Sequence, residues 1–267
     1  MEMQKTLDEL KTRSQGEAGA GDYIGADGLL YCGRCHTPRQ MRLEFMGKAD
    51  NVGVLCRCRQ EKKEREEQAR REWRQKEARE QLRKEGITNK RHRESRFDND
   101  RFPTSRPSRI ARRYVEQWET MFRQGRGLLL MGKPGTGKTF YACCIANALI
   151  DLGFASFVTN VAEITRTGGK DVERDAYIEK IRRCDLLVID DIGAERATEY
   201  ATESLYRVID IRYREEKPLI VTTNLTAAAL QADNVDKARI YDRITEMCPY
   251  QVIFEGDGLR RDKSLEL

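Results

Sequence analysis

An α/β domain with a parallel sheet is predicted for most of this 267-residue chain, preceded by a small cysteine module and a charged helix. Two observations predict the sheet: unbroken apolar runs, which are typical of strands buried on both faces, and helical patterns between those runs. Such an alternation indicates helices packed on both faces of a sheet, in three layers. Strands are expected at residues 127–131, 154–159, 186–189 and 218–223, and helices at 141–152 and 198–215.

Most of the net basic charge lies in one stretch ahead of the predicted sheet. The chain holds 49 basic and 44 acidic residues, and residues 56–113 alone hold 21 basic and 11 acidic ones. From Arg57 to Gly86 good helix formers dominate and no proline interrupts them, so we expect a long exposed helix. Two interpretations of this helix stay open: a solvated spacer, or an arm that meets DNA or a partner protein. Residues 89–96 are expected to form a flexible linker.

Membrane and secreted proteins are excluded by the apolar pattern. No run approaches the ~20 apolar residues that a spanning helix needs, and residues 1–9 lack the apolar core of a secretory signal. We therefore expect a cytoplasmic protein, whose thiols stay reduced. Four cysteines stand among apolar neighbours and are expected to be buried as small hydrophobic residues, namely Cys143, Cys144, Cys184 and Cys248.

The other four cysteines predict a zinc-binding module. Two residues separate Cys32 from Cys35, twenty more follow, and a single residue separates Cys56 from Cys58. Four thiolates close a tetrahedral zinc shell, and a module with little core gains its folding energy from the metal. His36 is an alternative ligand, although we favour the four thiolates. Because four protein ligands leave no open position on the metal, the expected role is structural or partner-binding.

A phosphate-binding loop follows the first predicted strand. The pattern G-x-x-x-x-G-K-[ST] lies between an apolar strand and a helical run, which is the context that the motif requires. Backbone N–H groups of such a loop surround phosphate oxygens, and the helix N-terminus adds positive charge. Lys138 is expected to reach the β- and γ-phosphates of ATP, and Thr139 to bind Mg²⁺. The expected nucleotide-binding residues are Gly132, Lys133, Pro134, Gly135, Thr136, Gly137, Lys138, Thr139 and, from a later strand, Asp190.

Polar residues at the ends of two later strands are expected to complete this site. Asp190 and Asp191 follow the apolar run 186–189, and Asn224 follows the run 218–223. Asp190 would hold Mg²⁺ through water, and Asp191 would orient or deprotonate the attacking water. Asn224 would position the same water from the next strand.

These motifs resemble the AAA+ ATPases of the DnaC/DnaI helicase-loader and IstB-like group. The resemblance rests on residues 97–99, 186–195, 222–225 and 239–244, and it covers about residues 95–262. It implies a P-loop AAA+ domain with an αβα three-layer fold, which acts as an ATP-driven switch. It also implies partners: the replicative hexameric helicase, single-stranded DNA and further copies of the ATPase domain. An N-terminal cysteine module joined by a charged helix is similar to the DnaC-like loaders of phages and prophages.

The resemblance also implies roles for single residues. Asn224 matches the sensor 1 position, and Arg239 matches the arginine finger that reaches the γ-phosphate of a neighbouring subunit. Sensor 2 falls within residues 252–260 and is placed at Arg260. Arg243, one helical turn after Arg239, is expected to form a structural ion pair.

Four segments are therefore expected along the chain. They are a flexible N-terminus at 1–27, a helicase-binding zinc module at 28–60, the charged helix and linker at 61–96, and the AAA+ ATPase domain at 97–267. The expected cofactors are ATP, Mg²⁺ and Zn²⁺.

An ATP-dependent loader of the replicative helicase onto single-stranded DNA is the expected function. Asp191 stands where most AAA+ proteins have Glu, and this shorter carboxylate predicts slow hydrolysis. DNA is expected to stimulate the ATPase. One alternative is an IstB-like transposition helper ATPase, which shares the core and binds duplex DNA. A zinc-dependent adaptor with a purely structural nucleotide site is a third interpretation, which the presence of Arg239 argues against.

Overall fold

The computed structural model describes residues 19–45, 47–166, 171–193, 198–226 and 235–255 of the chain. The chain forms two compact units, one up to Lys76 (the cysteine unit) and one from Glu77 onward (the sheet unit). Within the described ranges, no helix is both long and apolar enough to cross a membrane.

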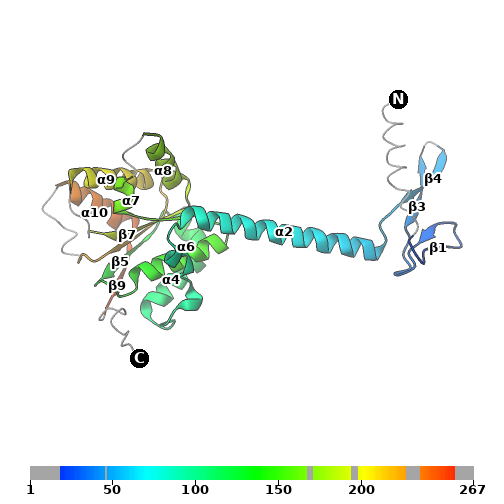
Figure 1. Ribbon diagram of the computed structural model, residues 1–267, viewed down its shortest axis with the longest axis horizontal. Helices are drawn as coiled ribbons and strands as arrows, with labels where there is room; N and C mark the ends of the chain where they lie inside the picture. Colours follow the sequence, from blue (N-terminus) through cyan, green and yellow to red (C-terminus); the bar gives the residue numbers. More distant parts are fainter. Residues whose placement is uncertain (1–18, 46, 167–170, 194–197, 227–234, 256–267) are drawn as a thin grey trace. The chain divides into compact units, whose positions relative to one another are not determined.

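A five-stranded parallel sheet forms the centre of the sheet unit (Figure 1). The strands lie in the order β6-β7-β8-β5-β9, and every neighbouring pair is parallel. The prediction of an α/β fold with a parallel sheet is therefore confirmed, with β9 as an edge strand that the apolar runs do not predict. The bounds are β5 Leu128–Gly132, β6 Ser156–Asn160, β7 Leu186–Ile192, β8 Leu219–Thr223 and β9 Tyr250–Phe254.

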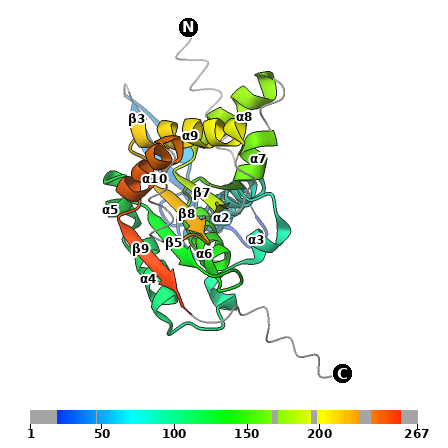
Figure 2. The ribbon, with the colours of Figure 1, turned by 90° about the vertical axis from the view of Figure 1, so that its left-hand side faces the viewer.

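Helices cover both faces of this sheet. Figures 1 and 2 show α4 and α6 on one side of the strands and α8, α9 and α10 on the other. The first layer consists of α4 Arg106–Glu116, α5 Trp118–Arg123 and α6 Lys138–Asp151. The second layer consists of α7 Val161–Arg166, α8 Asp171–Arg183, α9 Glu199–Arg214 and α10 Val235–Met247.

Successive side chains of each strand pack into opposite layers. Leu128 and Leu130 of β5 belong to the apolar cluster that contains the α4, α5 and α6 residues. Leu129 and Met131 belong to the cluster that contains residues of α7, α8, α9 and α10. Because both faces of the strand are buried, neither set of alternate positions is polar, which explains the unbroken apolar runs. The four cysteines expected in this core are buried, as predicted.

The predicted charged helix is α2 (Arg57–Gly86), whose 30 residues form one continuous helix. Ion pairs four residues apart run along it, for example between Lys62 and Glu66 at 3.7 Å. Residues 57–76 belong to the cysteine unit, and the remainder belongs to the sheet unit. There Arg83 is buried and donates to Asn147 Oδ1 of α6 at 3.1 Å. The end of α2 is therefore part of the layer that covers the sheet.

The segment after α2 is packed against α6, so the prediction of a flexible linker at 89–96 is wrong. It forms α3 (Lys90–Glu94), and the short 3₁₀ helix η1 (Phe97–Asn99) follows. Asn147 Nδ2 donates to the carbonyl oxygens of His92 at 2.8 Å and Ser95 at 2.9 Å. A buried amide thus satisfies backbone groups of this segment, and no local pattern in the basic sequence indicates it.

The cysteine unit is built from two antiparallel strand pairs. They are β1 (Tyr23–Ile24) with β2 (Leu30–Tyr31), and β3 (Gln40–Phe45) with β4 (Lys48–Gly53). The unit includes residues before 28, where the sequence places the start of the module. Asp22 accepts from Gly33 N at 3.1 Å and forms a buried ion pair with Arg39.

Candidate functional site

The phosphate-binding loop connects β5 to α6, as its sequence pattern predicts. Gly137 precedes the first residue of α6 and has φ 101°, a left-handed conformation that glycine adopts without strain. At Gly132 a Cβ atom would lie 2.4 Å from Phe254 O of β9, so a side chain does not fit. Inside the loop, Thr136 Oγ1 donates to Lys133 O at 2.9 Å. These constraints hold the loop in a tight turn before the N-terminus of α6.

Lys138 is buried beneath the loop and points toward β8. Its Nζ atom donates to Gly132 O at 2.7 Å, to Lys133 O at 2.9 Å and to Asn224 Oδ1 at 2.7 Å. An ammonium group with three donors is fully satisfied by these acceptors. The same donors suit the oxygens of a β- or γ-phosphate, which carry more negative charge than carbonyl groups.

Thr139 and Asp190 form the part of the site that fits Mg²⁺. Thr139 Oγ1 donates to Asp190 Oδ1 at 2.8 Å, which joins the start of α6 to the end of β7. A hydroxyl beside a carboxylate is an oxygen-donor set of the kind that Mg²⁺ binds, with water and phosphate oxygens completing the octahedron. These two residues would hold the ion, which would neutralise phosphate charge.

Asp191 and Asn224 lie side by side at the ends of neighbouring strands. Asn224 Nδ2 donates to Asp191 Oδ1 at 2.7 Å, while Asn224 Oδ1 accepts from Lys138. The amide therefore connects the lysine of the loop to the second carboxylate. Asp191 has φ 59°, an unusual conformation for a residue other than glycine.

A cavity of about 290 Å³ adjoins the loop and extends beneath the segment after η1. Its lining residues are Asn99, Asp100, Arg101, Phe102, Gly135, Gly137, Lys138, Thr139, Phe140 and Tyr141. A mainly apolar cavity next to a phosphate-binding loop is a suitable place for a nucleoside. The resemblance at Phe97-Asp98-Asn99 includes one lining residue, Asn99, but no pattern in the sequence indicates Asp100, Arg101 and Phe102.

Asp100 holds this segment in place. Its carboxylate accepts from Tyr141 OH at 2.8 Å, from Ser108 Oγ at 2.5 Å and from Phe102 N at 2.9 Å. Burial by itself raises the pKa of Asp100, but the hydrogen bonds, led by that from Ser108, bring it below its usual range. The carboxylate thus ties the chain before α4 to both α4 and α6.

Two arginines of α10 have different surroundings. Arg243 forms an ion pair with Asp210 Oδ1 at 2.9 Å, and its guanidinium lies 4.6 Å from the centre of the Tyr206 ring. Its predicted structural role is therefore confirmed. Arg239 is exposed, and the described residues offer it no hydrogen bond or ion pair. Arg260, expected as sensor 2, lies outside the described residues.

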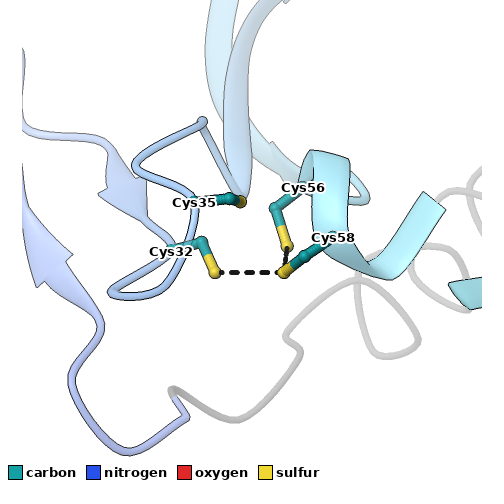
Figure 3. Close-up of side chains that lie close together, drawn as sticks. All are labelled: Cys32, Cys35, Cys56 and Cys58. Atoms are coloured by element: carbon teal, nitrogen blue, oxygen red, sulfur yellow. Dashed lines mark hydrogen bonds between the residues drawn. The ribbon is translucent and has the colours of Figure 1, made fainter. Parts of the chain in front are cut away.

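The four clustered cysteines of the cysteine unit point toward one another (Figure 3). All four sulfur atoms lie within 4.8 Å of one another, with 3.6 Å between Cys32 and Cys58 and 3.4 Å between Cys56 and Cys58. A tetrahedral zinc ion with bonds of about 2.3 Å has sulfur–sulfur edges of about 3.8 Å. The sulfur arrangement therefore fits Zn²⁺.

Hydrogen bonds around these sulfurs influence their protonation. Backbone N–H groups of Cys35 and Arg34 lower the pKa of Cys32, and the Thr37 hydroxyl lowers that of Cys35 to about 5. Such donors favour thiolates, which are the form that binds metals. His36, the alternative ligand, is engaged elsewhere, since its Nδ1 lies 3.3 Å from Tyr23 OH.

The parallel sheet, the phosphate-binding loop and the carboxylates at the ends of its strands define a P-loop protein of the AAA+ class. The chain belongs to the family of IstB-like ATP-binding proteins, whose model matches residues 58–266.

Curated relatives match the same region. The phage-like element PBSX protein XkdC of Bacillus subtilis is 32% identical over 150 residues, which cover 52% of this chain and 54% of that protein. The replicative helicase loader DnaC of Escherichia coli is 29% identical over 156 residues, which cover 56% of this chain and 61% of that protein. The chain thus spans about half the length of the curated relatives that it matches.

Solved structures share the fold. The crystal structure of the DnaC helicase loader has a TM-score of 0.52 at 24% identity and covers 62% of this chain and 100% of that one. The crystal structure of DnaI has a TM-score of 0.54 at 23% identity and covers 64% of this chain and 94% of that one. At this level of identity the likeness extends to the αβα fold alone.

Proposed function

We propose that this chain is an ATPase that loads a replicative helicase onto single-stranded DNA, with ATP hydrolysis as the switch. The observation that carries the proposal is the continuous set of contacts from Lys138 through Asn224 to Asp191. It joins a phosphate-binding lysine to a carboxylate suited to orienting water, as a hydrolytic site requires. The relatives named as replicative helicase loaders, from Escherichia coli and Bacillus subtilis, supply the link to helicases.

Each residue of the site then has a distinct task. Lys138 exchanges its carbonyl partners for the β- and γ-phosphates, and Thr139 and Asp190 hold Mg²⁺. Asp191 accepts a hydrogen bond from the attacking water, and Asn224 keeps that carboxylate in place. A positioned carboxylate of this kind raises the rate by orienting the water and by accepting its proton.

Hydrolysis would require a neighbouring subunit, since Arg239 is exposed on α10 and free of partners among the described residues. An arginine supplied in trans contributes about 10³–10⁵ in rate where this has been measured. We expect Arg239→Ala to bind ATP normally and to lose hydrolysis by at least about 10³-fold. Arg243→Ala is not a suitable control, because its ion pair with Asp210 is structural. Asp242→Ala, an exposed residue three positions after Arg239 on α10, is the control, and steady-state turnover of assembled protein is the measurement.

The cysteine unit would provide the contact with the helicase. Six of the eleven large exposed apolar residues of the described chain lie in this smaller unit: Tyr23, Ile24, Met41, Leu43, Leu55 and Trp73. We take this surplus of exposed apolar side chains as the surface that a partner protein covers. We assign the zinc module at 28–60 to this contact and the basic stretch of 56–113 to DNA phosphates.

The test is the mass of the complex formed with the replicative helicase of the host, in ATP and Mg²⁺. The full chain is compared with Leu43→Ser, 46% exposed in the cysteine unit, and with Leu152→Ser, 58% exposed in the sheet unit. We expect a stoichiometric complex for the unaltered chain and Leu152→Ser, and a weakened one for Leu43→Ser. Absence of a complex with the unaltered chain contradicts the loader function.

An IstB-like transposition helper is a second candidate function. The family model favours it, and so does an insertion-sequence ATP-binding protein of Sinorhizobium fredii that is 25% identical over 153 residues. This function predicts ATP-dependent filaments on duplex DNA and no complex with the helicase. Electron microscopy of the protein on duplex DNA with ATP distinguishes the two functions.

A further inference from the structure

A threonine that is not among the predicted site residues contacts both carboxylates of the site. Thr222 of β8 is 1% exposed, and its Oγ1 donates to Asp190 Oδ1 at 2.7 Å. The same oxygen accepts from Asp191 N at 2.8 Å. One hydroxyl group is therefore bonded to two consecutive residues that have different tasks.

The register of β7 and β8 explains why a side chain is needed at this position. Ile189 pairs with Val221 and Ile192 pairs with Thr223, so two residues of β7 stand opposite Thr222 alone. Such a bulge leaves a backbone group without its ladder partner and redirects the side chains next to it. The Thr222 hydroxyl takes the place of that partner for the N–H of Asp191.

The bulge also holds Asp191 in a strained conformation. Its φ of 59° is left-handed, where the Cβ atom of an L-residue crowds its own backbone. Two bonds hold it there: Thr222 accepts from its N–H, and Asn224 donates to its carboxylate. Without the hydroxyl, the backbone of Asp191 is free to return to an extended conformation, which moves the carboxylate away from Asn224.

We propose that Thr222 is a positioning residue for ATP hydrolysis, whose hydroxyl directs Asp190 toward Thr139 and Asp191 toward Asn224. This proposal rests on the proposed ATPase function and adds a residue to it. A hydroxyl suits the task because it donates one hydrogen bond and accepts another at the same atom. Valine has the same shape and makes neither bond.

The test compares three variants of the full chain: Thr222→Val, Thr222→Ser and, as the matched control, Thr159→Val. Thr159 is equally buried, at 2% exposed, in the strand β6, and its hydroxyl bonds Glu163 rather than Asp190 or Asp191. Steady-state hydrolysis of ATP, binding of a fluorescent ATP analogue and thermal melting are measured for each variant. Binding separates an effect on positioning from an effect on nucleotide affinity.

For Thr222→Val we expect kcat to fall on the order of 10- to 100-fold, with affinity for the analogue within about twofold of the unaltered chain. Thr222→Ser keeps the hydroxyl and should restore turnover, and Thr159→Val should retain it. Turnover of Thr222→Val like that of Thr159→Val overturns the proposal, and so does a Thr222→Ser variant as slow as Thr222→Val. An inactive unaltered chain instead overturns the ATPase function, and with it the role of Thr222.

Discussion

The two units of this chain bury their side chains in different ways. In the sheet unit, two apolar clusters of twenty residues each pack against the faces of the sheet. In the described part of the cysteine unit, the buried apolar residues are Cys32 and Cys56. Burial of apolar area stabilises a fold by about 25 cal/mol per Å², so the cysteine unit gains little from it. We therefore expect bound zinc to supply most of the folding free energy of the cysteine unit, and the sheet unit to fold without metal.

Removal of zinc tests the difference in stabilisation between the two units, and it is expected to have the largest effect. Structural zinc contributes about 10–16 kcal/mol in small modules, so a chelator should unfold the cysteine unit and leave the sheet unit folded. Hydrogen exchange should become fast in β3 and β4 and stay slow in β5 and β7. Cys35→Ser should act like the chelator. If metal analysis finds no zinc in the purified chain, zinc does not stabilise the cysteine unit, and the proposed difference between the two units is wrong.

A substitution in the core of the sheet unit should destabilise that unit and leave the cysteine unit folded. Arg212 is fully buried and donates to four carbonyl oxygens, those of Ile181, Cys184, Asp185 and Pro218. Arg212→Leu removes these four buried hydrogen bonds and should lower the free energy of unfolding by roughly 3–5 kcal/mol.

The measurement is denaturant unfolding followed by the fluorescence of Trp118, buried in the sheet unit, in a Trp73→Phe background. Arg214→Leu on the same helix is the control, since the Arg214 side chain is 75% exposed and an ion pair of such a residue contributes about 1 kcal/mol or less. Equal losses for the two arginine variants would contradict the role of Arg212.

Nucleotide should stabilise the sheet unit alone. Ligand at about 100 times its dissociation constant raises the free energy of unfolding by about 2.7 kcal/mol. With Mg²⁺ and ATP we expect a higher melting temperature for the sheet unit and an unchanged rate of hydrogen exchange in β3 and β4. Lys138→Ala removes the donor to the phosphates and should abolish the effect. Stabilisation that persists in this variant would place the nucleotide elsewhere.

The smallest expected effect is a pH dependence at Asp100. Its pKa in the folded chain is lower than its ordinary value of 3.8, because hydrogen bonds from Ser108, Phe102 and Tyr141 outweigh burial. A lowered pKa adds stability above pH 3.8, and the contribution is lost as the pH falls through the folded pKa. The melting temperature of Asp100→Asn should therefore lie below that of the unaltered chain at neutral pH, and the difference should shrink as the pH falls below 3.8. A constant difference across this range would contradict the prediction.

Much of the fold follows from local patterns. The apolar runs predict four of the five strands of the parallel sheet, because β5, β6, β7 and β8 are buried on both faces. The fifth, β9, lies at the edge, and its burial alternates, with Tyr250, Gln251 and Ile253 exposed. An alternating pattern over five residues is a weak signal, so this strand is evident only in the structure.

The site likewise has parts that the sequence predicts and parts that only the structure shows. The loop from Gly132 to Thr139 and the pair Asp190 and Asp191 are recognisable because the chemistry requires their spacing along the chain. The bulge at Asp191 and its contact with Thr222 depend on how β7 and β8 are aligned. Alignment of two strands that lie about thirty residues apart is decided by packing against both helical layers, which no local motif encodes.

The sequence by itself determined four strands of the parallel sheet, the phosphate-binding loop and the clustering of four cysteines. Each of these depends on residues close together in the chain, where periodicity and spacing act directly. Only the tertiary structure decided that residues 89–96 pack on Asn147 and that Asp100 closes a cavity beside the loop. These contacts join residues roughly 40 to 55 positions apart, and their free energy comes from burial and hydrogen bonds that exist only when the layers assemble.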